Sequence, residues 1–316
     1  MAHGVSTWHH GVVRTRRIVG LALCAMVLSA CSSEAGSQDQ SLTIGAFNFT
    51  ESQILAEVYA GALQANGYST SIIQSTNREV LQPALESGEV QMVPEYLGTL
   101  TEFLNLKENG PDATTLASGD VDATYEQAKL LGERVGITVL TPSPAADQNA
   151  FAVRGDFARQ YGLTSLSDLA ALSNSLGLNL GGPPECPQRP FCQPGLEGTY
   201  SMKFAKFVPL DAGGPLTKGA LSQGVIDVGL IFSSDGGVAS NDFVVLVDDL
   251  KLQQVDNIVP AVLSSSVTPE LTKILNAVSA AMTTDDLIAM NKAVDIDRRK
   301  PKDVAAEFLS AKGLVG

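Results

Sequence analysis

Residues 42–93 decide the fold class, and they read LTIGAFNFTESQILAEVYAGALQANGYSTSIIQSTNREVLQPALESGEVQMV. Within this stretch, three short apolar runs have the length of buried strands: 42–46, 69–73 and 90–93. Residues at helical spacing separate the first two runs, and a second helical stretch, 77–86, precedes the third. The alternation predicts a β-α-β-α-β unit and a predominantly parallel α/β arrangement, with ligands at the C-terminal ends of the strands.

The first helix of this unit is expected to begin at Thr50 and to end near Gly67. Thr50 and Gln53 have the spacing of a capping box, in which each side chain bonds to the other residue's backbone N–H group. Capping is a sufficient explanation for the Thr50-Glu51 pair, so we expect neither residue to contact a ligand.

Strands and helices continue to alternate along the rest of the chain. Further strands are expected at 138–140, 151–153, 226–231 and 243–247, and further helices at 125–133, 168–173 and 216–221. The chain ends in three helices with these start signals: Thr268 with Pro269, Thr284 or Asp285, and Pro301. We find no internal repeat.

Composition describes a globular protein of about two domains. The chain has 316 residues, of which 44% are hydrophobic and 17% charged, so it is too apolar for a disordered protein. It carries 34 acidic and 21 basic residues, a net charge of −13, and therefore has no basic face for nucleic acid.

Histidine chemistry is excluded from most of the chain, because His3, His9 and His10 are its three histidines. Ser-His-Asp triads and histidine-ligated metals are therefore not expected beyond the first ten residues. An enzyme would need a Ser-Lys dyad or a carboxylate pair, and no S-x-x-K motif follows a strand convincingly. We expect no catalysis, no cofactor and no metal site.

Residues 1–30 have the pattern of a lipoprotein signal peptide. Three arginines precede the apolar run 18–30, which is shorter than the roughly 20 residues that span a bilayer. The run ends in Leu-Ser-Ala directly before Cys31, and this junction resembles the lipobox at which bacterial lipoproteins are cut and lipidated. The alternative is an ordinary secretory leader followed by an incidental cysteine.

The polar residues after Cys31 predict a flexible tether over 31–41. Lipid on Cys31 would hold the protein at the outer face of the cytoplasmic membrane. Outside the cytoplasm, Cys186 and Cys192 in CPQRPFC are most simply a disulfide, which stabilises so short a loop by about 2 kcal/mol. A redox motif is disfavoured by the spacing, and zinc would need two further Cys or His ligands.

Five separated motifs carry a family resemblance: IGAFNFTESQIL (44–55), GEVQMVPEYLGTL (88–100), DQNAFAVR (147–154), GVIDVGLIFSSDGG (224–237) and the helical tail from PELTKILNAVSAAM to VAAEFL. In order and spacing they resemble the substrate-binding lipoproteins of osmoprotectant ABC importers, which bind glycine betaine, choline or carnitine. The resemblance implies a bilobal type II periplasmic-binding-protein fold, with two three-layer α/β lobes joined by two hinge strands. Lobe I would comprise 42–146 plus 240–316 and lobe II 147–239, with crossings near 148–151 and 240–243.

The resembled family holds a quaternary ammonium group in a cage of Tyr rings by cation–π attraction. Of the four cage positions, two carry rings here (Tyr96 and Phe232) and two do not (Asn149 and Lys218). The resemblance therefore implies seven candidate ligand contacts: Phe47, Asn48, Tyr96, Thr99, Asn149, Lys218 and Phe232. The competing interpretations are that Asn149 bonds only to backbone and that Lys218 lies on a solvated helix face.

These substitutions disfavour a cationic ligand. Two missing walls forfeit roughly 1–4 kcal/mol of cation binding, and a like charge on Lys218 about 5 Å away costs on the order of 3 kcal/mol. The main prediction is a monomeric, lipid-anchored receptor that captures a small solute for the permease of an osmoprotectant-type ABC importer. Two alternatives stay open: the same fold with a ligand that is no quaternary amine, such as a hydroxylated aromatic compound, and a surface sensor without a transport role.

Overall fold

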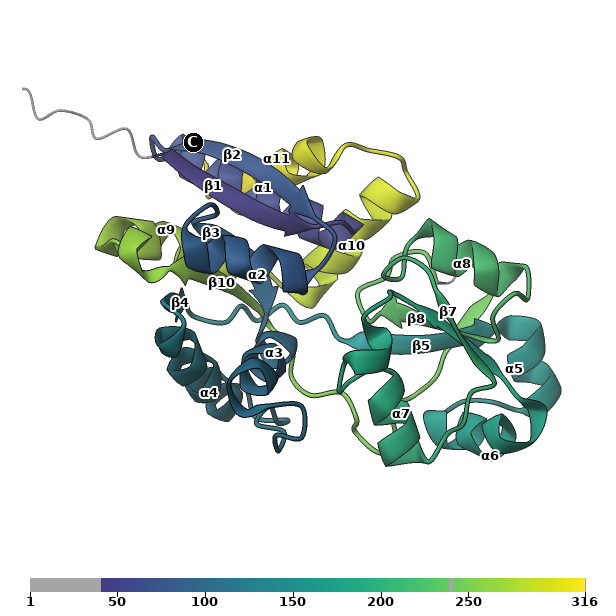
Figure 1. Cartoon of the computed structure of the whole chain (residues 1–316). Helices are drawn as coiled ribbons and strands as arrows, with labels where there is room; N and C mark the ends of the chain where they lie inside the picture. The colour runs from purple at the N-terminus through teal and green to yellow at the C-terminus, as the bar shows by residue number, and fades with distance from the viewer. Residues whose placement is uncertain (1–40, 239–240, 316) are drawn as a thin grey trace, which may run out of the picture. The chain divides into compact units, whose positions relative to one another are not determined.

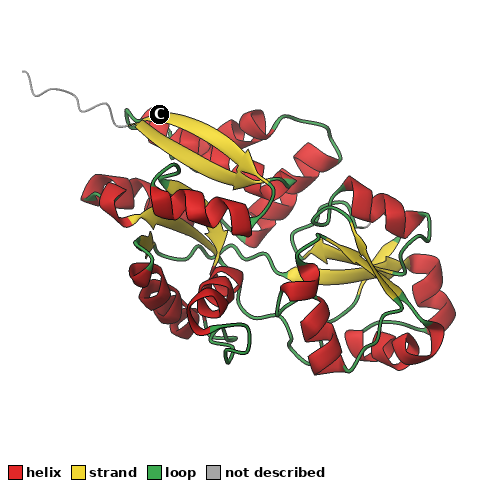
Figure 2. Ribbon diagram, viewed as in Figure 1, coloured by secondary structure: helices red, strands yellow, loops and turns green. Residues whose placement is uncertain are grey.

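A computed structural model describes residues 41–238 and 241–315 of the chain (Figure 1). Helices and strands are interspersed along these ranges up to residue 263, as expected of an α/β protein, and three α-helices follow (Figure 2). The expected signal peptide, Cys31 and the tether up to residue 40 lie outside the described residues.

Ten strands within these ranges form two five-stranded sheets. The first sheet has the order β2-β1-β3-β10-β4, with these bounds: β1 (Ser41–Phe47), β2 (Ser69–Ser75), β3 (Met92–Tyr96), β4 (Ile137–Val139) and β10 (Ile258–Leu263). The second sheet has the order β7-β6-β8-β5-β9, with these bounds: β5 (Asn149–Arg154), β6 (Asn179–Gly182), β7 (Lys206–Pro209), β8 (Val228–Phe232) and β9 (Phe243–Val245).

Helices connect and cover the strands of each sheet (Figure 1). Those that belong with the first sheet are α1 (Thr50–Ala65), α2 (Arg78–Ser87), α3 (Leu97–Asn109), α4 (Val121–Arg134), the 3₁₀ turn η3 (Ser264–Ser266), α9 (Pro269–Ala281), α10 (Thr284–Asp295) and α11 (Pro301–Ala311). Those that belong with the second sheet are α5 (Gly155–Tyr161), α6 (Leu166–Leu176), the 3₁₀ turn η1 (Cys186–Gln188), α7 (Gln193–Tyr200) and α8 (Pro215–Ser222). In these ranges, no helix combines the length and the apolar character needed to cross a bilayer.

Each sheet mixes parallel and antiparallel pairs. Strand β1 runs parallel to β2 and β3, whereas β10 runs antiparallel to β3 and β4. In the second sheet β6 runs parallel to β7 and β8, whereas β5 runs antiparallel to β8 and β9. In each sheet four of the five strands nevertheless run in the same direction, as a predominantly parallel arrangement predicts. Among the described strands, β10 and β5 run in the opposite direction, because they enter their sheets from the other sheet and not through a helical crossover.

The second crossing lies later in the chain than expected. Strand β9 pairs with β5, with Val245 opposite Ala152, and so it belongs to the second sheet. The chain returns to the first sheet through residues 246–257. The crossing expected at 240–243 and the lobe boundary expected at 240 are therefore both too early in the chain. The apolar run FVVLV indicates a strand, but only a distant pairing partner decides which sheet receives it.

The described residues form three apolar cores, one at the first sheet and two at the second. The first surrounds α1 and includes Tyr59, which is fully buried and whose hydroxyl lies 2.9 Å from that of Ser279. The second core includes Phe151 and extends to the disulfide cysteines, and the third includes Leu221 and Ile231. Because each sheet has its own core, the side chains that lie between the sheets can serve binding instead of packing.

Local signals set several helix starts correctly. Ser165 forms a capping box with Asp168 at the start of α6, and Thr268 accepts a hydrogen bond from the Leu271 N–H group at the start of α9. Helix α11 begins at Pro301 as predicted. The N-cap of α10 is Thr283, one residue before the predicted start.

Candidate ligand-binding site

A cavity of about 370 Å³ is lined by residues from both sheets and their connections. Strands β1, β3 and β8 end at Phe47, Tyr96 and Phe232, and all three rings line this cavity. The C-terminal ends of strands are where ligands bind in α/β proteins. Two sheets thus contribute aromatic rings to one space.

Phe49 completes an aromatic cluster that we define as Phe47, Phe49, Tyr96 and Phe232. The centroid of the Phe49 ring lies 6.1 Å from that of Phe47, 6.1 Å from that of Tyr96 and 5.2 Å from that of Phe232. Phe49 lines the cavity but was not among the expected contacts. Its position in the sequence, at the end of the loop after β1 and just before α1, is the feature that could have identified it as a ligand contact.

The start of α1 differs from the predicted capping box. Phe49 is the N-cap residue, and no side chain caps the helix there. The hydroxyl of Thr50 instead donates to Asp295 at 2.6 Å, and the hydroxyl of Ser52 accepts from the Phe47 N–H group at 2.8 Å. The helix begins at Thr50 as predicted, but the capping box is wrong, because Asp295, far along the chain, takes the hydrogen bond of the Thr50 hydroxyl.

Glu51 is buried at the centre of a polar network, although the sequence suggested only capping. Its carboxyl group accepts hydrogen bonds from the Tyr96 hydroxyl at 2.9 Å, the Asn291 amide at 2.7 Å and the Ser234 hydroxyl at 2.5 Å. Burial raises the pKa of Glu51. Burial, followed by the neighbouring charge of Glu51, also raises the pKa of Asp147 well above its ordinary value. This carboxyl pair therefore favours retaining a proton.

Arg78 crosses one face of the aromatic cluster. Its guanidinium group donates to both oxygens of Glu95, at 2.8 and 2.6 Å, and lies 5.4 Å from the centroid of the Phe47 ring. A third hydrogen bond, of 3.1 Å, reaches the hydroxyl of Thr99. Thr99 lines the cavity as expected, but this bond already occupies its hydroxyl. The charge of Arg78 is neutralised inside the protein.

Arg189 is a partly buried, positively charged side chain that lines the cavity and keeps an unused hydrogen-bond donor. Its guanidinium group bonds to Glu79 at 2.8 Å and lies 5.5 Å from the centroid of the Phe103 ring. The Nε atom is buried without a hydrogen-bond partner. Burial, followed by the charge of Arg78, lowers the pKa of Arg189, but an arginine stays protonated. In the sequence, the loop CPQRPFC indicates only a disulfide and gives no signal for Arg189.

Lys218 and Asn48 do not line this cavity, so the structure does not bring them together with the other expected contacts. The Lys218 ammonium group lies 2.6 Å from Asp235 and 3.8 Å from Asp295. Lys218 and Asn48 both line a second cavity of about 350 Å³, which shares Phe49 and Phe232 with the first cavity. The predicted cost of a like charge beside a cationic ligand therefore does not apply, because Asp235 neutralises Lys218.

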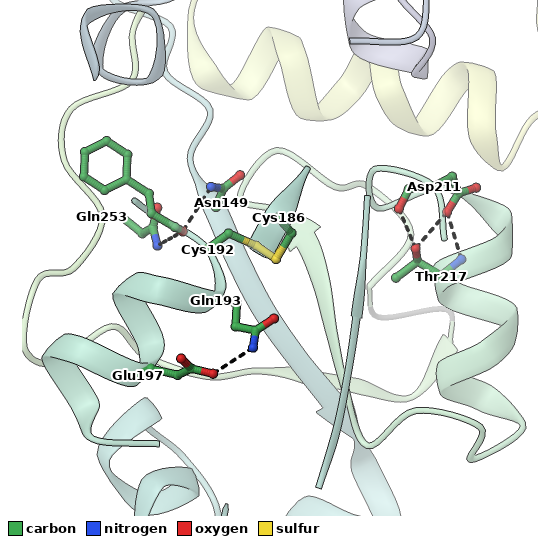
Figure 3. Close-up of a disulfide and its surroundings, with 9 residues drawn as sticks. Asn149, Cys186, Cys192, Gln193, Glu197, Asp211, Thr217 and Gln253 are labelled. Carbon is green, nitrogen blue, oxygen red and sulfur yellow. Dashed lines mark hydrogen bonds between the residues drawn. A yellow bond between two sulfur atoms is a disulfide. The ribbon is translucent and has the colours of Figure 1, made fainter. Parts of the chain in front are cut away.

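Asn149 lines the cavity but bonds to backbone, as one of the two interpretations expected. Its side-chain amide donates to the carbonyl oxygen of Phe191 at 3.2 Å. A disulfide joins Cys186 and Cys192 on either side of that segment, and both cysteines are buried (Figure 3). In the described part of the chain, no group of His, Cys, Asp and Glu side chains could hold a metal ion.

Residues 40–311 match the family described as OpuAC, the substrate binding domain of the ABC-type glycine betaine transport system. The chain belongs to this family. It is a family of transport substrate-binding proteins and not a family of enzymes. Its members lie outside the cytoplasm and work with ABC permeases. The recognised family and the transport role are thus confirmed.

Named relatives match along most of their length. A glycine-betaine-binding protein of Pseudomonas aeruginosa is 28% identical over 301 residues, 90% of this chain and 94% of that protein. The glycine betaine-binding protein YehZ of Escherichia coli is 28% identical, over 94% of this chain and 96% of its own. The carnitine transport binding protein OpuCC of Listeria monocytogenes is 25% identical, over 92% and 93%.

Solved structures confirm the type II periplasmic-binding-protein fold. A glycine betaine/carnitine/choline ABC transporter structure aligns with a TM-score of 0.65 at 23% identity, covering 86% of this chain and 99% of that one. The ligand-free YehZ of Escherichia coli aligns with a TM-score of 0.59 at 27% identity, covering 87% and 99%.

Asp256, a buried carboxyl group that lines the cavity, makes stability depend on pH. It accepts a hydrogen bond from the Thr99 N–H group at 3.0 Å, and burial raises its pKa from 3.8 to about 7. The folded state holds the proton of Asp256 more tightly than the unfolded state does. The stabilisation from this protonated group is therefore complete below pH 3.8 and is lost as the pH rises to 7. Asp256→Asn should therefore reduce the fall in the free energy of unfolding between pH 4.5 and 7.5, by up to a few kcal/mol.

Urea unfolding of the wild type and both variants at the two pH values measures this difference. The control is Asp168→Asn, because the bonds to Thr164 and Ser165 lower the pKa of Asp168 to about 2. Its stabilising effect is lost only as the pH falls from 3.8 to 2, so the variant should keep the wild-type change between pH 4.5 and 7.5. If the free energy of unfolding changed equally between the two pH values in the wild type and in Asp256→Asn, the raised pKa of Asp256 would be contradicted.

Proposed function

We propose that the cavity binds a small zwitterion of the glycine betaine type and that the protein delivers it to the permease of an ABC importer. The observation that carries this proposal is the presence, in one cavity, of aromatic rings and of an arginine with an unpartnered Nε atom. The names of the relatives, which bind glycine betaine or take part in carnitine transport, support the same class of ligand.

The aromatic cluster supplies the site for the cationic end. Arg78 covers one face of Phe47, so the rings of this cluster that are left for a ligand are Phe49, Tyr96 and Phe232. Each ring contributes about 0.5–2 kcal/mol to binding a quaternary ammonium group. The hydrogen bond to Glu51 holds the Tyr96 ring in place. Phe49 thus offsets the loss of an aromatic wall at Asn149.

Arg189 supplies the site for the anionic end. Its Nε–H group has no acceptor within the protein, and a buried donor without a partner costs free energy that a ligand carboxylate recovers. The cavity is large enough for a small zwitterion with a few waters. A hydroxylated aromatic ligand loses its main support, because Lys218 faces Asp235 instead of the cavity.

Calorimetric titration of the full-length chain with glycine betaine and with choline tests the two ends separately. Choline has the same quaternary ammonium group but lacks the carboxylate, so we expect it to bind at least about tenfold more weakly. Arg189→Gln should weaken glycine betaine binding by about 10–100-fold and leave choline within about twofold.

The matched control is Arg299→Gln, because Arg299 pairs with Glu307 and lines neither cavity. It should bind both solutes as the wild type does. The proposal fails if glycine betaine does not bind, or if its affinity is the same after Arg189→Gln. Tighter binding of 4-hydroxybenzoate than of glycine betaine would instead support the aromatic alternative.

We also propose that Cys31 is lipidated and anchors a monomeric receptor at the outer face of the cytoplasmic membrane. The basic start, the apolar run and the small residues before Cys31 support this. Cys31→Ser should abolish labelling with palmitate and leave residues 1–30 attached, because the junction is cut only at a lipidated cysteine. Cys24→Ser, within the apolar run, is the control and should stay labelled and processed. Unchanged labelling of Cys31→Ser would contradict the proposal.

A further inference from the structure

We infer that the Cys186–Cys192 disulfide, together with Asn149 and Gln253, positions Arg189 for the ligand. Residues 186–192 are then a preformed binding loop, tied to the start of β5 and to the segment 246–257 that links the two sheets. The inference rests on the proposed function of the cavity and identifies what holds its anion-binding side chain in place.

The disulfide closes a ring around the backbone of Arg189. Cys186 opens the 3₁₀ turn η1, and Cys192 is the N-cap residue of α7. The Arg189 N–H group donates to the Cys186 carbonyl at 3.2 Å, and the Cys192 N–H group donates to the Arg189 carbonyl at 3.0 Å. Both polar groups of the Arg189 backbone are thus bonded to the two residues that the disulfide joins.

Helix α7 supports the loop by direct contact. A Cβ atom added at Gly195 would collide with the carbonyl oxygen of Pro190 and lie 2.5 Å from a methyl group of Leu252. Pro187 and Pro190 restrict the backbone within the loop further, because the proline ring fixes φ. The loop therefore has little freedom to move away from α7.

One carbonyl group ties the loop to the start of β5 and to the second linking segment. The Phe191 oxygen accepts hydrogen bonds from the Asn149 amide at 3.2 Å and from the Gln253 amide at 3.0 Å (Figure 3). Asn149 is the first residue of β5, where the chain enters the second sheet, and Gln253 lies in the segment 246–257 that leaves it. Asn149 is therefore a positioning residue, at a position where the resemblance implied an aromatic wall.

The side chain of Arg189 extends from this loop to the first sheet. There it contacts Phe103 of α3 and bonds to Glu79 of α2. An arginine that is already held in its binding orientation loses less side-chain entropy when a ligand arrives. If the loop were released, the same contacts would have to be formed at the moment of binding, and the affinity would fall.

A double-mutant cycle separates positioning from simple stabilisation. The full-length wild type, Arg189→Ala, Cys186→Ser with Cys192→Ser, and the combined variant are titrated with glycine betaine by calorimetry. We expect removal of the disulfide to weaken binding about tenfold when Arg189 is present and less than twofold when it is absent. Equal weakening in both backgrounds would overturn the inference, because the disulfide would then act on the fold as a whole.

Gln253→Ala provides a second variant that keeps the disulfide, in case its removal prevents folding. It should weaken glycine betaine binding about threefold with Arg189 present and leave it unchanged in the Arg189→Ala background. Leu169→Val is the matched control, because Leu169 is buried in the same core but is not part of the loop. It should lower the melting temperature without changing the affinity.

Hydrogen–deuterium exchange of the ligand-free protein distinguishes a failure of this inference from a failure of the proposed function. Removing the disulfide, or replacing Asn149 and Gln253 by Ala, should speed the exchange of the Arg189 and Cys192 amides at least about tenfold. If glycine betaine does not bind the wild type, the proposed function fails, and the exchange alone decides whether the loop is held as inferred. Unchanged exchange would overturn the inference.

Discussion

The buried carboxyl group of Glu51 is the contact on which the arrangement of the binding site depends. A carboxyl group is costly to bury unless it is protonated or receives hydrogen bonds, and Glu51 receives them from Tyr96, Ser234 and Asn291. These donors come from the end of β3, from the loop after β8 and from α10. Satisfying one buried group thus brings both sheets together beside the aromatic cluster.

The charges around the cavity follow a second constraint, since each buried cation has its own acid. Arg78 pairs with Glu95, Arg189 with Glu79 and Lys218 with Asp235. Because each positive charge is neutralised by a neighbouring carboxylate, the cavity has little net positive charge that would repel a quaternary ammonium group. The pairing also leaves the unpartnered Nε of Arg189 as a local donor for a carboxylate. A zwitterion is the class of ligand that matches both features.

Local signals in the sequence predicted the strands whose ends carry Tyr96 and Phe232, the disulfide loop and most helix starts of the tail. What they could not predict are choices made by distant partners. Strand β10 was not predicted at all. Its formation, the direction of β5, the sheet that receives β9 and the pairing of Lys218 all depend on residues far along the chain. Phe49 was missed because a local capping pattern at Thr50 explained the same segment.

The most direct test of this account is the position of glycine betaine in a crystal structure of the complex. We predict that the carboxylate lies within hydrogen-bonding distance of the Arg189 Nε atom and that the methyl groups contact the rings of Phe49 and Phe232. Glycine betaine bound in the second cavity beside Asp235, or in the first cavity with its carboxylate turned away from Arg189, would contradict the account.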